Sequence, residues 1–310
     1  MSRVFTAIKL IITVSIFYLL FRYIDFDDLY AILAKSHGGY ILLALLAQLI
    51  SMYLAIYRWK LIMSRLKFDE KSSFYTKSYF KGTFFNQILP GSIGGDAVRM
   101  LDLVQKGYDK KDAFYGIFVD RVVGLVGLLV LNLIANNLFY DTYPSWLYTL
   151  LNIVTLGGIA GFTAMLYLDK LTFLSNIKGL NLLFRLGLRM RKLYANKAVL
   201  LKHIAISVVV HMFSVVAIFF LALSVDVWMG LHIFLIAVPP VFLLTIVPIS
   251  LAGWGVREGA MVAILMLVGI AKAKILAISI LYGLLLIITA LPGAWIFNKY
   301  KNINNKKATL

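Results

Sequence analysis

Uninterrupted apolar runs are the feature that most constrains this chain. Runs of roughly 20 apolar residues recur along the sequence, and each is long enough to cross the hydrocarbon core of a bilayer as an α-helix. The runs are continuous rather than alternating, which argues against a transmembrane β-barrel. With 61% hydrophobic residues over 310 positions, the chain is predicted to be an all-α, polytopic integral membrane protein, with one transmembrane domain over 1–310.

Six of these runs are predicted to be full membrane spans. The first ends in Phe-Arg-Tyr and has no small-residue cleavage site, so we interpret it as a retained span rather than a signal peptide. At the end of the second, Tyr57 and Trp59 are expected to lie in an interfacial aromatic belt. The predicted spans are about 5–24, 39–57, 112–139, 146–168, 201–225 and 275–297.

A Pro/Gly-rich stretch interrupts two further apolar regions with the same spacing. The first copy is ILPGSIGGDAVR over 88–99, and the second is IVPISLAGWGVR over 246–257. Aligned on proline, the copies share a serine, an aliphatic residue, a glycine, a valine and a final arginine. Proline and glycine break helices, and an arginine within a membrane segment is costly. We therefore predict a binding site at these two breaks.

The two halves of the chain share more than this motif. Each half contains a span, an apolar segment, a Pro/Gly break, a short helix, a lysine-bearing turn and a long helix. We predict internal repeat units at about 39–140 and 201–298, a pattern found in many transporters. The broken segments 72–106 and 229–268 are interpreted as re-entrant hairpins. Between the repeats, 169–200 is predicted to be a cytoplasmic amphipathic connector.

The basic residues orient this arrangement. With re-entrant hairpins, 22 basic residues outside the membrane segments fall on the side of both termini and 4 on the other side. The positive-inside rule then places both termini in the cytoplasm, in the plasma (inner) membrane. The hairpins dip in from opposite faces, so the repeats are inverted. Full crossing by each broken helix is the alternative, and it fits the charges less well. Because the net charge of +17 lies mainly in these loops, no nucleic-acid partner is expected.

Each break is followed by a short predicted helix, at about 96–106 and 255–268. The first N–H groups of a helix have no intrahelical partners, and together with the helix dipole they attract anions. Asp96 suits this position, whereas Arg99 and Arg257 oppose the dipole. Arginine is favoured there when a phosphate lies between the guanidinium and the helix end, because the guanidinium matches phosphate oxygens.

Structural explanations of the same residues stay open. Pro90 and Pro248 could simply kink helices while Arg99 pairs with Asp96 or Asp120. Arg257 and Glu258 could form a local ion pair. Asp120 and Arg121, within a predicted span, could be a structural ion pair, or the arginine could extend to the interface.

Motifs for catalysis and for metals are missing from the sequence. It has no HExxH, hydrolase GxSxG or Walker lysine, no dense acidic cluster and no cysteine. We therefore expect neither a catalytic residue nor a metal or other cofactor, and the protein is not expected to be an enzyme.

Three stretches resemble the signature regions of a known family. They are NQILPGSIGGDAVR at 86–99, DRVVG at 120–124 and VPISLAGWGVRE at 247–258, in the family's order. The sequence is thus similar to the flippase-like transmembrane family, also called the lysylphosphatidylglycerol synthase transmembrane region, over nearly its whole length. Asp120 departs from the family, which often has glutamate there. Together with Asp120, the substrate-binding residues that we expect from this resemblance are Asn86, Pro90, Gly94, Gly95, Asp96, Arg99, Arg121, Pro248, Gly253, Gly255, Arg257 and Glu258.

The resemblance also implies a function. In the multiple peptide resistance factor, this region is associated with moving aminoacylated phosphatidylglycerol between leaflets, and other relatives are linked to isoprenoid-phosphate glycans or hopanoid pathways. We expect translocation of an anionic phospholipid or a lipid-linked phosphate intermediate. The chain ends soon after its last span, without an aminoacyl-transferase domain, so lysyl-lipid synthesis is not expected of it. The expected partners are the bilayer, the anionic lipid and, as a candidate, a lipid-synthesis enzyme.

Two other functions remain open. One is a membrane component of a polyprenyl-phosphate glycosyl- or aminoacyl-transferase pathway. The other is a non-transporting scaffold for a lipid-synthesis complex.

Overall fold

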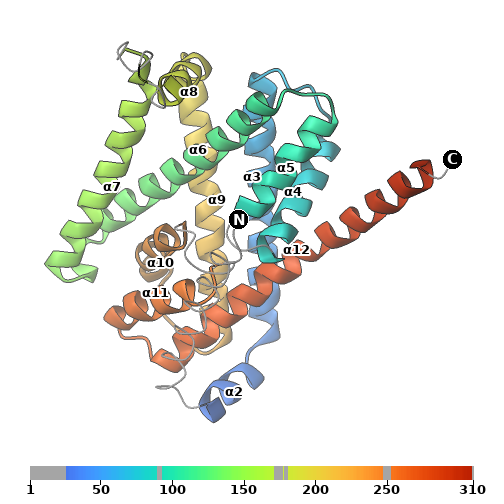
Figure 1. The fold of residues 1–310 in the computed structure, drawn as a ribbon. Helices are drawn as coiled ribbons and strands as arrows, with labels where there is room; N and C mark the ends of the chain where they lie inside the picture. Colours follow the sequence, from blue (N-terminus) through green and yellow to red (C-terminus); the bar gives the residue numbers. More distant parts are fainter. Residues whose placement is uncertain (1–25, 89–92, 171–176, 178–180, 247–252, 309–310) are drawn as a thin grey trace.

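The computed structural model describes residues 26–88, 93–170, 177, 181–246 and 253–308, and there the chain folds into α-helices joined by short turns (Figure 1). The helices are α2 Phe26–Ala34, α3 Gly38–Arg65, α4 Ser72–Ile88, α5 Ile93–Gln105, α6 Lys110–Leu138, α7 Ser145–Leu166, α8 Asn181–Leu193, α9 Lys197–Ser224, α10 Leu231–Ile246, α11 Val256–Leu265 and α12 Lys272–Ala308.

Five of these helices, α3, α6, α7, α9 and α12, are long and apolar enough to cross a membrane. They confirm five of the predicted spans, and the predicted first span at 5–24 lies outside the described residues. One boundary was wrong: α3 continues to Arg65, so Arg58 and Trp59 lie inside a helix rather than at its end. Trp59 is fully buried, which contradicts the predicted interfacial belt. The segment expected to be a loop at 25–38 contains α2.

α3 and α9 lie side by side through the centre of the bundle and run antiparallel (Figure 1). The amide of His37, just before α3, donates to the carbonyl of Ser224 at the end of α9. Further along, the hydroxyls of Ser51 and Ser214 lie 2.9 Å apart. Small buried residues along both helices allow this close contact, as is common in membrane bundles.

Both predicted helix breaks are present. α4 ends at Ile88 and α5 begins at Ile93, while α10 ends at Ile246 and α11 begins at Val256. α4 packs against α5, and α10 packs against α11. The motif prolines, Pro90 and Pro248, lie outside the described residues. α5 begins three residues before its predicted start at 96, so Arg99 lies in its second turn.

The two broken pairs, α4–α5 and α10–α11, start from opposite ends of α3. Beyond the C-terminal end of α3, the ring of Phe68 before α4 contacts that of Tyr108 after α5, with ring centroids 4.6 Å apart. Near the N-terminal end of α3, Lys274 in α12 donates to the carbonyl of Asp226, which follows α9. Asp226 also faces His37 at 3.3 Å. The residues that flank each pair therefore lie close together.

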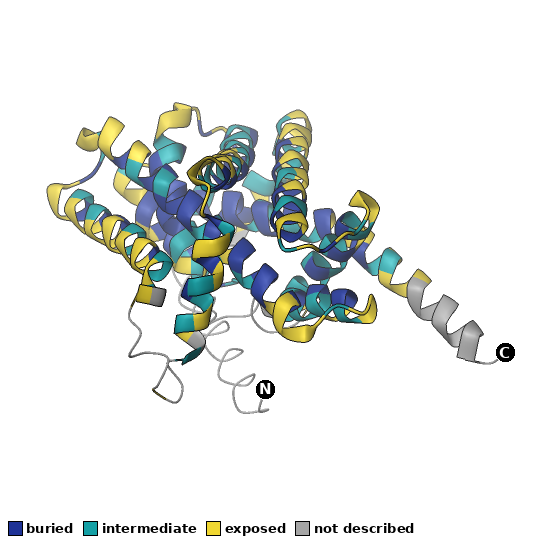
Figure 2. Ribbon diagram, turned by 90° about the horizontal axis from the view of Figure 1, so that it is seen from above, coloured by how far each residue is buried: buried dark blue, intermediate teal, exposed yellow. Residues whose placement is uncertain are grey.

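The long helix that follows each broken pair also packs against the other pair. α12 packs against α4, and α6 packs against α10. The buried residues lie on the facing sides of the helices, and much of the outer surface is exposed (Figure 2). α7 lies at the outside of the bundle and buries few of its residues. An outer surface with so many apolar side chains fits a lipid environment.

Candidate functional site

A network of three arginines and two aspartates joins α3, α5 and α6. Asp120 of α6 accepts from the Arg58 Nε at 3.0 Å and from an Arg99 terminal nitrogen at 2.9 Å. Asp96 of α5 accepts from the Arg121 Nε at 2.7 Å and from Arg99 at 3.2 Å. Arg58, Arg99 and Asp120 are buried. The five side chains carry three positive and two negative formal charges, so the network has a net charge of +1.

Close helix contacts hold this network in place. A Cβ at Gly95 would collide with the carbonyl of Gly82 and would lie 2.6 Å from the Asn86 side-chain oxygen. At Gly124, a Cβ would lie 3.2 Å from an Arg58 guanidinium nitrogen. Gly95 therefore lets α4 approach α5, and Gly124 lets Arg58 pass α6. Asn86 accepts from the Gly95 amide at 2.8 Å and so satisfies one of the free N–H groups at the start of α5.

Arg99 is also held between aromatic rings. Its guanidinium carbon lies 4.0 Å from the centroid of a Trp59 ring and 4.9 Å from that of the Tyr79 ring. The Nε of Arg99 is buried and has no hydrogen-bond partner among the described residues. A buried donor of this kind can accommodate an additional acceptor.

Two cavities meet at this network. A polar cavity of about 100 Å³ is bounded by α3, α4, α5 and α6. A larger and mainly apolar one, of about 420 Å³, extends along α6 toward α9 and α10. Both are lined by Arg58, Tyr79, Asp120 and Arg121. The network is thus polar on one side and adjoins an apolar space on the other.

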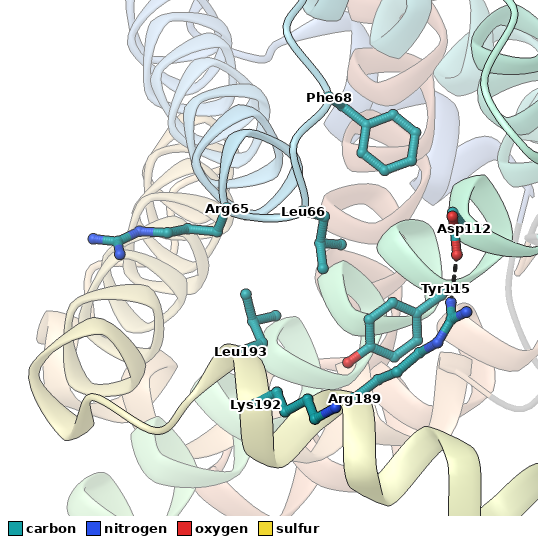
Figure 3. Close-up of a pocket in the computed structure, with 8 residues that line it drawn as sticks. All are labelled: Arg65, Leu66, Phe68, Asp112, Tyr115, Arg189, Lys192 and Leu193. Carbon is teal, nitrogen blue, oxygen red and sulfur yellow. Dashed lines mark hydrogen bonds and ion pairs between the residues drawn. The ribbon is translucent and has the colours of Figure 1, made fainter.

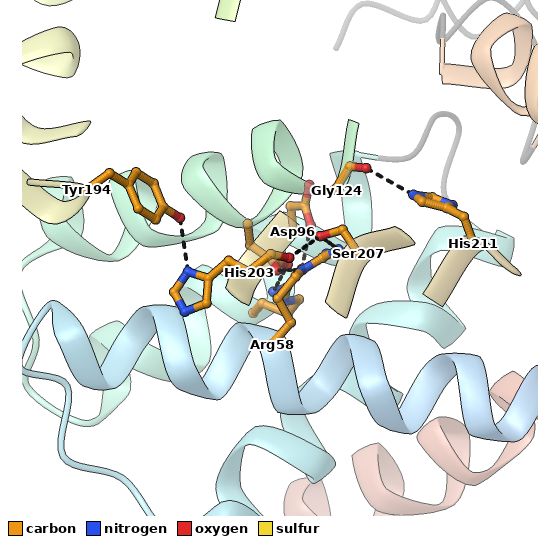
Figure 4. Close-up of polar contacts among 9 residues, drawn as sticks. Arg58, Asp96, Gly124, Tyr194, His203, Ser207 and His211 are labelled. Carbon is orange, nitrogen blue, oxygen red and sulfur yellow. Dashed lines mark hydrogen bonds and ion pairs between the residues drawn. The ribbon is translucent and has the colours of Figure 1, made fainter. Parts of the chain in front are cut away.

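Arg58 extends the network to α9. It donates to the hydroxyl of Ser207 at 2.9 Å, and Ser207 in turn donates to the carbonyl of His203 (Figure 4). The Nδ1 of His203 lies 3.2 Å from the hydroxyl of Tyr194, in the turn before α9. Burial raises the pKa of the Tyr194 hydroxyl, which therefore stays neutral. Figure 4 also shows His211 of α9 directed at the carbonyl of Gly124, 3.0 Å away.

The second break forms a smaller cluster around Arg257. The Nε of Arg257 donates to the Glu258 carboxylate at 3.1 Å and to the hydroxyl of Ser279 at 3.2 Å, and Ser279 donates to the same carboxylate at 3.0 Å. The guanidinium lies 4.6 Å from a Trp254 ring centroid. Arg257 and Glu258 are buried. This cluster pairs one positive with one negative charge.

Glycine backbone conformations shape the start of α11. Gly253 has a φ of +81° and Gly255 a φ of +85°, values that other residues rarely adopt. The amide of Gly255 donates to Glu258 at 2.6 Å, which is one half of a capping box. The carbonyl of Gly253 accepts from the Arg257 amide at 3.0 Å. These glycines therefore have a structural role at the helix start.

The structure brings most predicted site residues into these two clusters. Asn86, Gly95, Asp96, Arg99, Asp120 and Arg121 lie in or beside the first, and Gly253, Gly255, Arg257 and Glu258 form the second. Gly94 lies in the first turn of α5. The ion pairs of Arg99 with both aspartates, and of Arg257 with Glu258, are those that a structural role predicts. Their presence does not by itself assign a substrate.

Sequence reasoning missed three members of the first cluster. Arg58 directly follows the predicted end of the second span at 57, so the sequence places it outside the membrane, whereas α3 continues to Arg65. Ser207 and Tyr79 have no distinguishing pattern. One signal for Arg58 was available: Asp120 and Gly124 are four residues apart on one face of α6, where Asp120 provides a carboxylate and Gly124 leaves space for a cation.

The comparison with known families agrees with this geometry. The family described as the lysylphosphatidylglycerol synthase TM region matches residues 6–293. The chain belongs to this family. The match covers both clusters and all five long helices except the end of α12, so the protein is a multi-pass membrane protein of a lipid-related family. It is the TM region alone that is found, with no synthase domain in these 310 residues. No curated protein matches the chain significantly.

Metal ligands do not gather anywhere in the described part of this TM region. There, no group of three or more histidine, aspartate or glutamate side chains is placed to hold a metal ion. The chemistry of the first cluster comes from guanidinium groups, which are suited to phosphate and carboxylate oxygens.

Proposed function

We propose that this protein moves an anionic phospholipid, or a lipid-linked phosphate intermediate, between the leaflets of the bilayer. The phosphate binds at the network of Arg58, Arg99 and Arg121. The observation that carries this proposal is the shared wall of the polar and apolar cavities, because four residues line both. A ligand that fills both has an anionic group joined to an apolar chain, which is the chemistry of such a lipid.

The charge of the network favours an anion. With three guanidiniums against two carboxylates, one positive charge has no counter-ion within the network. The net positive charge of the network attracts an anion, so a bound phosphate stabilises the site. The Arg99 Nε provides a donor, and Asp96 and Asp120 orient the arginines. A phosphate can replace one carboxylate at Arg99 or Arg121.

The arrangement of the broken helices supports a path through the membrane. We infer that α4–α5 and α10–α11 are re-entrant hairpins in inverted repeat units at about 39–140 and 201–298. Three observations support this: the residues that flank each pair lie close together, the two flanking regions lie at opposite ends of α3, and α3 and α9 are antiparallel. In this proposal Arg99 and Arg257 bind the phosphate in turn, beside the motif positions Asn86, Pro90, Gly94, Pro248 and Gly253.

The proposed orientation has both termini in the cytoplasm, with α8 lying on the cytoplasmic surface. Because the chain has no cysteine, single cysteines can be placed at Lys110 and Lys272 without background. We expect membrane-impermeant maleimide to label these two positions from opposite sides of intact cells. Labelling of both from the same side would contradict the inverted repeat.

Leaflet exchange tests the function directly. Purified protein is reconstituted in liposomes with fluorescent phosphatidylglycerol, and dithionite quenching reports the lipid that reaches the outer leaflet. We expect exchange with the wild type and its loss with Arg99→Gln and with Arg121→Gln. The Arg121 side chain is 46% exposed, so its variant is expected to fold. Lys202→Gln removes an exposed charge elsewhere and serves as the matched control.

Other outcomes would favour other functions. Product formation from a donor and a polyprenyl-phosphate acceptor would indicate a transferase component. No exchange and no product, with stable co-purification of a lipid-synthesis enzyme, would indicate a scaffold. Exchange that is unchanged in both arginine variants would contradict the proposed site.

A further inference from the structure

A second pocket lies at one end of the bundle, apart from the arginine network. It has a volume of about 310 Å³ and is formed where α3 ends, α6 begins and α8 lies across them (Figure 3). Its lining residues are Arg65, Leu66, Phe68, Asp112, Tyr115, Arg189, Lys192 and Leu193.

The charges around this pocket are mostly positive. Three basic side chains, Arg65, Arg189 and Lys192, line it together with one acid, Asp112. Arg189 pairs with Asp112 at 2.6 Å, and both side chains are about half exposed. Among the described residues, Arg65 and Lys192 form no ion pair. Arg65 lies at the rim in Figure 3, with its guanidinium turned outward. The pocket thus has a net formal charge of +2.

A buried hydroxyl without a partner points into the same space. Tyr115 of α6 is only 3% exposed, and its hydroxyl has no hydrogen-bond partner among the described residues. Figure 3 shows this oxygen directed toward Lys192 and Leu193. The guanidinium of Arg189 lies 5.3 Å from the Tyr115 ring centroid. A buried hydroxyl left without a partner is unfavourable, so an acceptor oxygen placed beside it would stabilise the site.

The remaining walls are apolar. Leu66, Phe68 and Leu193 line the pocket, and Met190 and Tyr194 anchor the end of α8 in the core beside it. α8 carries Arg185, Arg189, Arg191 and Lys192 on an otherwise apolar helix, as helices at a membrane surface do. Cations, a hydroxyl donor and apolar walls together suit a phosphate ester that carries a hydrocarbon chain.

We propose that this pocket binds the phosphate headgroup of an anionic phospholipid and is the first station for lipid that then reaches the arginine network. Arg65 and Arg58 are seven residues apart on α3, so they lie on one stripe of the helix, roughly 10 Å apart along its axis. The binding stands by itself, whereas the role as a first station rests on the proposed function.

Binding is measured by native mass spectrometry of the full chain after delipidation, with phosphatidylglycerol as the probe. The Arg121→Gln background removes binding at the arginine network, so the remaining lipid reports this pocket. Adding Arg65→Gln and Lys192→Gln is expected to weaken binding about tenfold, because each substitution removes a charge-assisted contact. Lys197→Gln with Lys202→Gln removes the same charge nearby, outside the pocket, and is expected to leave binding unchanged.

Competition separates the two sources of phosphate. Soluble glycerol phosphate shares the headgroup chemistry without the chain, and we expect it to displace phosphatidylglycerol only weakly. Displacement by glycerol phosphate as strong as that by phosphatidylglycerol would overturn a lipid ligand. Equal loss of binding in the pocket double variant and in the control double variant would overturn the site.

Tyr115→Phe provides a second test that does not depend on charge. Without lipid, we expect the variant to be at least as stable as the wild type, because it removes an unpaired buried hydroxyl. With phosphatidylglycerol, we expect weaker binding than the wild type. A lower melting temperature of the lipid-free variant would show that the hydroxyl contributes to folding, and would contradict its assignment to the ligand.

Exchange assays separate this inference from the proposed function. With the arginine network intact, Arg65→Gln with Lys192→Gln should slow exchange several-fold, and a higher mole fraction of phosphatidylglycerol should restore it. If the wild type binds lipid here but exchanges none, the proposed function fails and the binding site stands. If this double variant exchanges lipid as fast as the wild type at a low mole fraction of phosphatidylglycerol, the role of the pocket as a first station is overturned.

Discussion

The two clusters follow the two copies of the sequence motif but differ in charge. In each, an arginine from the second helix of a broken pair contacts a polar side chain of the following long helix: Asp120 for Arg99, and Ser279 for Arg257. A glycine follows four residues later in both cases, Gly124 and Gly283, and it leaves room for a guanidinium.

The first half has several additional charges at these places. α3 and α9 both have 28 residues, and aligning their first residues places Arg58 opposite Ala217, which is fully buried. Aligning Asp120 with Ser279 places Arg121 opposite Ile280. The second cluster is consequently neutral and satisfied by its own residues, whereas the first keeps a net positive charge beside two cavities. The comparison indicates that a repeated motif can keep a net charge in one copy and be neutralised by its own residues in the other.

The largest expected effect is on stability at the shared polar position. Asp120→Ala leaves Arg58 and Arg99 buried without their carboxylate, and we expect a loss of about 3–5 kcal/mol. Ser279→Ala removes one hydroxyl, and we expect a loss of about 1 kcal/mol. Thermal unfolding in detergent, in parallel for both variants, measures the difference. Equal losses of stability would show that the additional charges of the first cluster do not make its polar position more important than that of the second.

The motif glycines should differ in how they tolerate a methyl group. At Gly95 a Cβ meets the backbone of α4, so Gly95→Ala should separate α4 from α5 and cost about 1–3 kcal/mol. At Gly253 there is open space, but φ is +81°, so Gly253→Ala should cost about 1 kcal/mol. Melting temperatures check the order. A milder effect at Gly95 would mean that α4 and α5 move apart easily.

Replacing the buried ion pair of the second cluster sharpens the functional comparison. Arg257→Met with Glu258→Gln removes the pair but keeps an acceptor for the Gly255 amide, and we expect a stability change within about 2 kcal/mol. Leaflet exchange is the informative measurement. Its loss in a folded protein supports phosphate binding at both clusters in turn, and full exchange would limit binding to the first.

The smallest expected effect concerns the contact between Arg58 and α9. Ser207→Ala removes one hydrogen bond from a guanidinium that keeps its bond to Asp120, so we expect a loss of about 1 kcal/mol. Exchange should remain within about twofold of the wild type. A large drop in exchange without unfolding would show that Ser207 positions Arg58 for the substrate.

Apolar runs and motif spacing were enough to predict an all-helical membrane protein. Five spans and both breaks follow from residues whose placement in a bilayer is tightly constrained. The ion pairs of Arg99 with Asp96 and Asp120 are the structural explanation that the sequence left open. Arg58 and Trp59 were misplaced because a charge was taken as the end of a span. Their burial depends on partners 62 and 40 positions away, Asp120 and Arg99, which no local pattern reveals.

One helix, α12, contacts the second cluster directly and also packs against α4, which borders the first cluster. Gly283 faces Arg257 and Trp254, and ten residues on, Gly293 lies so close to the backbone of Phe80 that a methyl group would not fit. The separation along the axis is roughly 15 Å. Pro292 adjoins the second contact and removes a backbone hydrogen bond there. Any shift of α11 that carries α12 with it must also displace α4, so movements at the two helix breaks are coupled through α12.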